Sequence, residues 1–465
     1  MKLLALFLFL ISSFASAEIY LSVTGAGVRR AKIAVGDVRP LGDSASSDAS
    51  LASQIRNQVL TDLEFMNIFE FIPDSTAIST DKESGSEMDY SKWSLLGTTF
   101  ALRLGYKVDS SKMTLDAQFY DIPGQKRIFA QTYQSNSNNT ARIAHELSEA
   151  ILKSLTGEKG LFKSRILMVC HDLNKRKSPP KEVYIVDADG RNLIQLTADN
   201  TLSLSPSWMN DGSNISYTQF EFLISKGVRK RGAVLKKHNL STGARSILSF
   251  RDGMNSGAAW SPNGNRGVVT LSFTGKPELY FIEPSGSAEP EPLSRNIQIK
   301  SLTSTIPQAT NPNLLFDVEP SWSPDGKSLV FSSARTGNPM IYVADLNNNS
   351  ARQITFAGKY NATPAWSPKG DKILFAAQRA PNGNFDIYMI DPDGNNLSRL
   401  TVGDKPGRKI NHENPSWAPT GRHFAIASNE SGSYGIYVLT ADGALKKRVS
   451  PEGKECKSPD WGPAE

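Results

Sequence analysis

A tryptophan-centred phrase recurs through the second half of this 465-residue chain. Each full copy has a small residue before Trp and a turn ending in Gly four residues after it, as in Ser-Trp-Ser-Pro-Asp-Gly. Successive tryptophans lie 44 to 62 residues apart, a period typical of four-stranded propeller blades. One blade cannot bury both of its faces, so the repeats predict blades stacked in a ring. The copies are centred on Trp208, Trp260, Trp322, Trp366, Trp417 and, truncated, Trp461.

The two ends of the repeat region predict how the ring closes. Trp461 has no strands after it, whereas residues 165–197 contain three strand patterns with no tryptophan phrase before them. Joined, these fragments complete one blade, which gives a six-bladed β-propeller closed by the C-terminal strand. A solenoid is the alternative, but it would need capping ends rather than complementary fragments.

The N-terminus has the pattern of a secretory signal peptide. Lys2 precedes the apolar run Leu3–Phe14, and Ala15-Ser16-Ala17 supplies small residues before a cleavage site at Glu18. The run is too short for a permanent transmembrane helix, and a buried core helix is the alternative. We therefore expect residues 1–17 to be removed and the mature chain to be exported.

Residues 18–160 have a different pattern and predict a small α/β domain. A strand is expected at Ile33–Val38, and apolar spacing predicts helices at Leu51–Leu63 and at Ala141–Leu155. Residues 100–108 and 113–120 read as a hairpin, Thr140 is a possible helix cap, and Gly157 is the expected stop. The predicted domains are the signal peptide at 1–17, the α/β domain at 18–160 and the all-β propeller at 161–465.

Catalytic motifs are absent from the sequence. There is no Gly-x-Ser-x-Gly elbow, and the five histidines form no metal-binding spacing. Asp187-Ala-Asp-Gly190 and Asp391-Pro-Asp-Gly394 resemble calcium loops but lack the acidic twelfth residue, so they are expected to be hairpin turns. We expect no enzyme activity, no catalytic residues, no cofactor and no metal.

The charge pattern says less about partners. The formal net charge of +6 is only weak evidence for nucleic-acid binding, so we do not expect a nucleic-acid partner. We also expect no direct membrane insertion. Basic runs such as Arg229-Lys230-Arg231 have two interpretations. They are solvated blade edges, or they attract anionic envelope polymers or lipid head groups.

The two cysteines, Cys170 and Cys456, fall on strands that become antiparallel neighbours if the ring closes as described. An exported protein meets an oxidising compartment, where disulfides persist. The hypothesis is a disulfide clasp across the closure, and the alternative is a pair of free or partly buried thiols.

The whole layout resembles the TolB family of periplasmic propeller proteins of the Tol–Pal envelope system. The resemblance rests on the stretch Glu18-Ile-Tyr-Leu-Ser-Val23, on the linker Leu155–Arg165 and on the six tryptophan phrases. It implies a non-enzymatic adaptor that supports outer-membrane integrity and envelope constriction during cell division. The implied partners are the lipoprotein Pal, at one mouth of the propeller, and TolA, at the mature N-terminus.

Carried onto this chain, the resemblance implies two sets of binding residues. The TolA segment begins with Glu18, Ile19, Tyr20, Leu21, Ser22 and Val23. The Pal-facing loops enter the tryptophan strands and comprise Ser205, Pro206, Met254, Asn255, Ser256, Val318, Glu319, Asn361, Thr363, Glu413 and Asn414. The chain departs from the family pattern near Asp252–Ser256 and has an insertion around Arg295–Pro312.

One other class of function remains open on the sequence. A periplasmic enzyme or a glycan-binding propeller would use the central channel as a pocket lined by acidic and aromatic side chains. The entry loops offer Glu319 and Glu413, but they form no obvious catalytic pair.

Overall fold

A computed structural model describes most of the chain: residues 30–41, 49–73, 88–136, 139–158, 160–174, 179–225, 227–293, 298–299, 316–379, 383–405, 407–444 and 446–464. Contacts within the chain divide it into two compact units. One unit comprises Met1–Glu64 and Ile68–Lys159, and the other comprises Phe65–Asn67 and Gly160–Glu465. Within the described ranges, no helix combines the length and the hydropathy needed to cross a bilayer.

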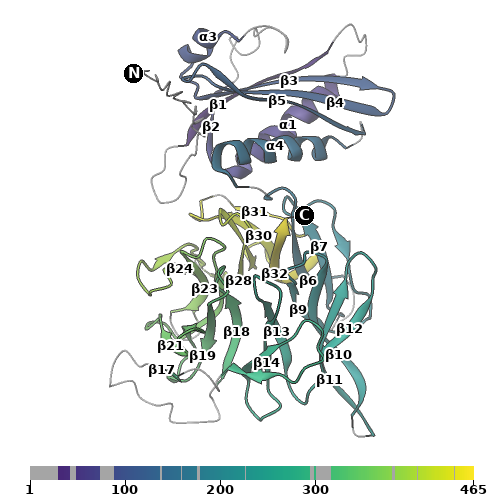
Figure 1. Cartoon of the computed structure of the whole chain (residues 1–465), viewed down its shortest axis with the longest axis vertical. Coiled ribbons are helices and arrows are strands. Elements are labelled where there is room, and N and C mark those ends of the chain that lie inside the picture. The colour runs from purple at the N-terminus through teal and green to yellow at the C-terminus, as the bar shows by residue number, and fades with distance from the viewer. Residues whose placement is uncertain are drawn as a thin grey trace, which may run out of the picture. The chain divides into compact units, whose positions relative to one another are not determined.

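The first unit is a five-stranded sheet with helices, ordered β2-β1-β3-β4-β5. β1 runs parallel to β2 and β3, and the remaining pairs are antiparallel. Figure 1 shows α1 and α4 along one face of this sheet. The elements are β1 (Ala31–Pro40), α1 (Ala49–Met66), β2 (Phe69–Phe71), α3 (Tyr90–Leu95), β3 (Phe100–Asp109), β4 (Lys112–Asp121), β5 (Lys126–Asn136) and α4 (Thr140–Thr156).

The predicted elements of this unit are confirmed, with one correction. The apolar spacing of α1 is buried as expected at Leu51, Ile55, Val59 and Leu63. Gly157 ends α4 in the left-handed region, at φ 72°. The N-cap of α4 is Asn139 rather than Thr140, because the Asn139 side chain accepts a hydrogen bond from the backbone N–H of Arg142.

The second unit contains six four-stranded blades, as the repeats predicted. The closing blade has the strand order β32-β6-β7-β8, so it combines the last strand with the first three of the propeller. Figure 1 shows β32, in yellow, beside β6, in teal. Its strands are β6 (Ser164–Asp172), β7 (Glu182–Asp187), β8 (Ile194–Gln195) and β32 (Lys454–Ala464).

The other five blades are each built from contiguous chain, and we number them 2 to 6 in chain order. Their strands are β9 (Ser203–Trp208), β10 (Asn214–Ser225), β11 (Val228–Asn239) and β12 (Arg245–Ser249) in blade 2; β13 (Asn255–Trp260), β14 (Gly267–Leu271), β15 (Glu278–Ile282) and β16 (Glu291–Pro292) in blade 3; β18 (Asp317–Trp322), β19 (Ser328–Ser333), β20 (Met340–Asp345) and β21 (Ser350–Gln353) in blade 4; β22 (Tyr360–Trp366), β23 (Ile373–Gln378), β24 (Phe385–Ile390) and β25 (Ser398–Arg399) in blade 5; and β28 (His412–Trp417), β29 (His423–Ser428), β30 (Gly435–Thr440) and β31 (Lys446–Arg448) in blade 6.

Three short strands lie outside this scheme. β17 (Gln298–Ile299) pairs in parallel with β21, and β26 (Asp404–Lys405) pairs with β27 (Arg408–Lys409). The predicted insertion Arg295–Pro312 lies outside the described residues except for β17.

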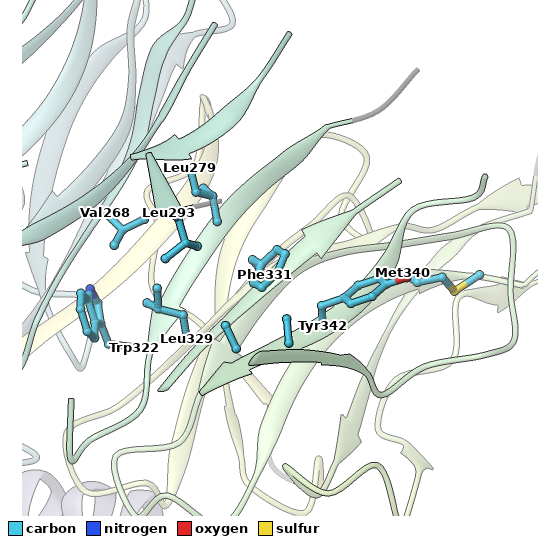
Figure 2. Close-up of a cluster of buried hydrophobic side chains, with 10 residues drawn as sticks. Val268, Leu279, Leu293, Trp322, Leu329, Phe331, Met340 and Tyr342 are labelled. Carbon is cyan, nitrogen blue, oxygen red and sulfur yellow. The ribbon is translucent and has the colours of Figure 1, made fainter. Parts of the chain in front are cut away.

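The tryptophans of the five complete copies pack at the boundaries between blades. Figure 2 shows the cluster in which Trp322 of blade 4 meets Val268 and Leu279 of blade 3. The Trp322 indole N–H also donates to the carbonyl of Ala259 in blade 3, at 3.1 Å. Trp417 makes the corresponding bond to Ala365, at 3.1 Å. The repeated tryptophan therefore joins neighbouring blades, which explains why its spacing matches the blade length.

A hydroxyl near the end of each of four blades fixes the third strand. The Thr355 hydroxyl accepts a hydrogen bond from the backbone N–H of Ile341, 14 residues earlier, at 2.9 Å. Thr197, Thr401 and Ser450 make the same bond to Val183, Ile387 and Ile436, respectively, each at 2.9 Å. These bonds satisfy buried N–H groups where the outer strand ends.

Candidate partner-binding site at the propeller channel

The innermost strands of all six blades surround one cavity of about 580 Å³. These strands are β9, β13, β18, β22, β28 and β32, each at the end of its sheet. The tryptophan phrase therefore serves two purposes: its indole packs between blades, and its flanking residues line the channel. Proline recurs in the lining at Pro206, Pro320, Pro364, Pro415 and Pro459, and again at Pro262, Pro324, Pro368, Pro419 and Pro463.

The residue three positions before each tryptophan has a left-handed backbone. The φ values are 47° at Ser205, 65° at Gly257, 58° at Glu319, 48° at Thr363, 53° at Asn414 and 53° at Ser458. At the same place the pairing of each inner strand with its neighbour shifts register, as between Val318 and Ser321. A β-bulge of this kind bends the strand and redirects side chains. Each blade therefore presents a local kink at the channel.

Glu319 and Thr363 both have positive φ, and one hydrogen bond connects them. Neither residue type favours positive φ, and a β-branched side chain is strained there. The Glu319 carboxylate accepts a hydrogen bond from the backbone N–H of Thr363 at 2.7 Å, and so connects blade 4 to blade 5. Burial in the channel raises the pKa of the Glu319 carboxyl, partly opposed by this hydrogen bond.

A second carboxyl group lies in the closing blade. Asp460 immediately precedes Trp461, and its side chain accepts the backbone N–H of Trp208 at 2.7 Å. Burial raises the pKa of Asp460 to about 6, while hydrogen bonds from Trp208, Ser207 and Ser416 oppose the rise. The corresponding positions in blades 4 and 6 are Ser321 and Ser416, whose hydroxyls accept the N–H of Trp366 and Trp461.

The channel is therefore acidic and apolar in character. Among the described residues that line it, none is Lys, Arg or His, so no cation offsets Glu319 and Asp460. The structure also shows no cluster of three or more potential metal ligands among the described residues. Such a lining can bind a partner through apolar contact and hydrogen bonds, since tryptophan and proline provide rigid surface.

The expected Pal-facing residues divide into two groups. Ser205, Pro206, Glu319, Thr363 and Asn414 line the channel. The other residues of the set lie outside the lining, and they are Met254, Asn255, Ser256, Val318, Asn361 and Glu413.

Asn255 and Asn361 are buried, at 0% and 1% exposure. The Asn255 amide donates to the carbonyls of Ala233 and Arg251, and the Asn361 amide donates to the carbonyl of Ala357. Their amides satisfy backbone groups of the entry loops, so this burial argues against direct partner contact. Sequence position alone could not distinguish a loop-holding Asn from an exposed one.

Other expected residues lie at the rim of the channel. Met254 is 41% exposed, and the Ser256 hydroxyl is 3.4 Å from that of Ser205. Val318 is partly exposed. Glu413 accepts a hydrogen bond from the Tyr434 hydroxyl at 2.9 Å, and the Lys457 ammonium lies 3.6 Å from its carboxylate. The expected TolA segment, Glu18 to Val23, lies outside the described residues.

Sequence reasoning missed Asp460, Gly257 and Ser458, and it did not predict the left-handed conformation of Ser205, Glu319, Thr363 and Asn414. One signal was available for Asp460: it is the only acidic residue directly before a tryptophan in the six copies. The Asp-x-Asp-Gly segments were interpreted correctly as turns, since Gly190 and Gly394 both have φ 93°. In each turn an Asn side chain donates to the first Asp, Asn192 to Asp187 and Asn396 to Asp391, both at 2.6 Å.

The closure joins the two cysteines. Cys170 on β6 and Cys456 on β32 are directly paired across the strands, with Cα atoms 4.2 Å apart, and the structure contains a disulfide between them. The bond links residues 286 positions apart in the chain. Trp461 adds a second connection, since its indole N–H donates to the Ser164 hydroxyl at 2.8 Å.

Comparisons with known proteins agree with this architecture. The model of the TolB beta propeller domain matches residues 152–465, and that of the TolB amino-terminal domain matches residues 19–128. A relative named Protein TolB homolog, from Chlorobium luteolum, is 29% identical over 98% of this chain and 96% of its own. The Tol-Pal system protein TolB of Desulfotalea psychrophila is 29% identical over 58% of this chain and 57% of its own.

A solved structure shows the same fold along nearly the whole chain. The crystal structure of TolB from Acinetobacter baumannii superposes with a TM-score of 0.72 at 24% identity, covering 94% of this chain and 97% of that one. The propeller model alone spans most of the chain. The chain belongs to the TolB family.

Proposed function

We propose that this chain is a periplasmic, non-enzymatic adaptor of the Tol–Pal system, in which the propeller binds Pal and the mature N-terminus binds TolA. The family and the name of the relative from Desulfotalea psychrophila, a Tol-Pal system protein, support this proposal. In this role the protein would support outer-membrane integrity and envelope constriction during cell division. The apolar run and small residues at the start of the chain support export.

The observation that best supports a protein partner is the repeated construction of the channel mouth. Each blade contributes a left-handed residue and a bulge at the same position, so the mouth is formed by six similar elements. The Glu319–Thr363 and Asp460–Trp208 hydrogen bonds connect neighbouring blades there. A rigid rim reduces the entropy lost on binding.

Two variants test the mouth as the Pal surface. Met254→Asp places a charge on an exposed apolar residue of the entry loop, and should reduce Pal capture from detergent-solubilised envelopes by at least tenfold. Leu397→Asp is the matched control. Leu397 is 53% exposed and follows β24, at the opposite end of the blade from the entry loops, so capture should be unchanged. Equal capture by both variants would contradict the assignment.

The TolA assignment needs its own test. Deletion of residues 18–29 from the mature protein should abolish TolA binding and leave Pal capture intact, as measured by pull-down of each partner. Unchanged affinity for TolA would refute the N-terminal assignment.

A channel enzyme or a glycan-binding propeller remains a second candidate because of Glu319 and Asp460. Carboxyl groups with a raised pKa are common at catalytic sites. Here both groups accept backbone N–H bonds from the next blade, which gives them a structural explanation. Glycan turnover by the pure protein, lost in Glu319→Gln, together with no recovery of Pal, would favour this second candidate.

A further inference from the structure

The hairpin of β10 and β11 extends past the rest of its blade. Each strand has 12 residues, whereas the β9 ladder ends at Gln219 and the β12 ladder begins at Leu235. Between these limits, the two strands of the hairpin pair only with each other in the sheet. Figure 1 shows this hairpin reaching beyond the neighbouring strands.

One face of the extension combines apolar and cationic side chains. Phe222 pairs with Arg231, and Ile224 pairs with Arg229. Directly paired residues of antiparallel strands project from the same face, so these four side chains form one patch. Phe222 is 59% exposed and Ile224 is 77% exposed. The Arg229 guanidinium lies 4.7 Å from the centre of the Phe222 ring.

The opposite face is attached to the propeller. Lys230 projects from that face, and its ammonium lies 2.8 Å from the Asp252 carboxylate in the entry loop of blade 3. Gly232, on the same face, approaches the Phe250 ring. These contacts lie on the opposite face of the hairpin and leave the Phe222–Arg229 face uncovered by described residues.

We propose that the hairpin patch, Phe222, Ile224, Arg229 and Arg231, binds the surface of a bilayer containing anionic phospholipids. The proposed contact is peripheral. Two apolar side chains enter the head-group region while the arginines pair with lipid phosphates, so no segment spans the membrane. The sequence analysis expected no direct membrane insertion, and this proposal adds only a contact of side chains with the lipid head groups.

The shape of the patch favours a lipid surface over a protein. Its two apolar side chains, Phe222 and Ile224, are exposed near the end of a two-stranded hairpin, whereas protein hot spots are typically well-packed pockets. The charges at the patch are both positive, and two described carboxylates near it, Glu221 and Asp252, pair on the other face with Lys236 and Lys230. Anionic head groups are therefore the complementary surface.

Vesicle flotation tests the proposal with the full mature chain. Wild type should bind vesicles of three parts phosphatidylcholine to one part phosphatidylglycerol, and binding should weaken as salt rises. Phe222→Ser with Ile224→Ser should reduce the bound fraction at least tenfold. Arg229→Gln with Arg231→Gln should reduce the partition coefficient roughly fivefold for each charge removed.

Matched controls separate membrane contact from misfolding. Ile194→Ser with Leu397→Ser removes two other exposed apolar side chains, at 52% and 53% exposure, and should leave vesicle binding unchanged. The melting temperature of each hairpin variant should equal that of wild type. The proposal is overturned if wild type does not float with the anionic vesicles, or if the control reduces binding equally. It is also overturned if the hairpin variants lose only Pal capture, which would make the hairpin a protein-docking element.

Discussion

The closing blade and the five contiguous blades reach the same four-stranded sheet by different means. In blades 2 to 6 the strands are neighbours in sequence, so each sheet forms through short turns. In the closing blade, β32 pairs with β6 although nearly 300 residues separate them, and a disulfide and the Trp461–Ser164 hydrogen bond cross that junction. Joining distant segments costs conformational entropy, so covalent and polar links concentrate where the ring closes.

The largest expected effect is at the disulfide. Cys170→Ser with Cys456→Ser should lower the free energy of unfolding of the propeller by about 3–5 kcal/mol, since the unfolded chain regains the freedom of a long loop. Thermal unfolding followed by calorimetry measures the change.

A thiol count provides the control. Denatured, unreduced wild type should contain no reactive thiol. Two reactive thiols would remove the covalent difference between the closing blade and the others.

The next effect is pH-dependent and depends on Asp460. Because its folded-state pKa is raised to about 6, the folded propeller binds this proton more tightly than the unfolded chain does. Wild type should therefore gain stability as pH falls from 8 toward 4. Asp460→Asn should remove this gain and stabilise the propeller at pH 8 by about 1–2 kcal/mol.

The matched variant in a contiguous blade is Ser321→Ala. It removes the acceptor for the Trp366 N–H and should cost about 1 kcal/mol at every pH. Melting temperatures between pH 4 and pH 8 check both variants. Parallel pH profiles for wild type and Asp460→Asn would contradict the role assigned to this carboxyl.

A third pair of variants tests whether the outer strands differ between the two kinds of blade. Thr197, in the closing blade, accepts the Val183 N–H and donates to Glu182, and Thr401, in blade 5, does the same with Ile387 and Asp386. Replacing either threonine by valine should cost about 1–2 kcal/mol, because buried polar partners are left unpaired. Urea unfolding should give equal losses. A much larger loss at Thr197 would show that closure strains the outer strands too.

The smallest effect is at the left-handed position of the inner strand. Gly257→Ala in blade 3 should cost about 1 kcal/mol from backbone conformation alone, because the added Cβ would meet only the Thr270 hydroxyl, at 3.9 Å. Ser458→Gly in the closing blade should change stability by less than about 0.5 kcal/mol. Glycine removes the backbone strain of the φ of 53° at this position, but it also makes the unfolded chain more flexible, and the two effects oppose each other. A large loss in the second variant would indicate that the Ser458 side chain itself supports closure.

The sequence was informative wherever a local pattern determines the structure. Strands such as Leu329–Phe331 follow from apolar runs beside Asp-Gly turns, and the α1 and α4 helices follow from apolar spacing. β2, β5 and α3 of the first unit were missed, since β2 has three residues, β5 is mostly exposed and α3 has only six residues. Of the candidate mouth residues, five line the channel, whereas Asn255 and Asn361 are buried.

The sequence by itself determined the number of blades, their boundaries and the way the ring closes, because the tryptophan phrase is periodic and its two end fragments are complementary. Only the tertiary structure decided which side chains each strand turns toward the channel, the raised pKa of Glu319 and Asp460, and the exposed hairpin patch. The physical reason is that conformation at Glu319 and Thr363, and the protonation of Asp460, depend on a neighbouring blade 44 or more residues away. The residues adjacent in the sequence do not reveal which residues of that neighbouring blade will contact them.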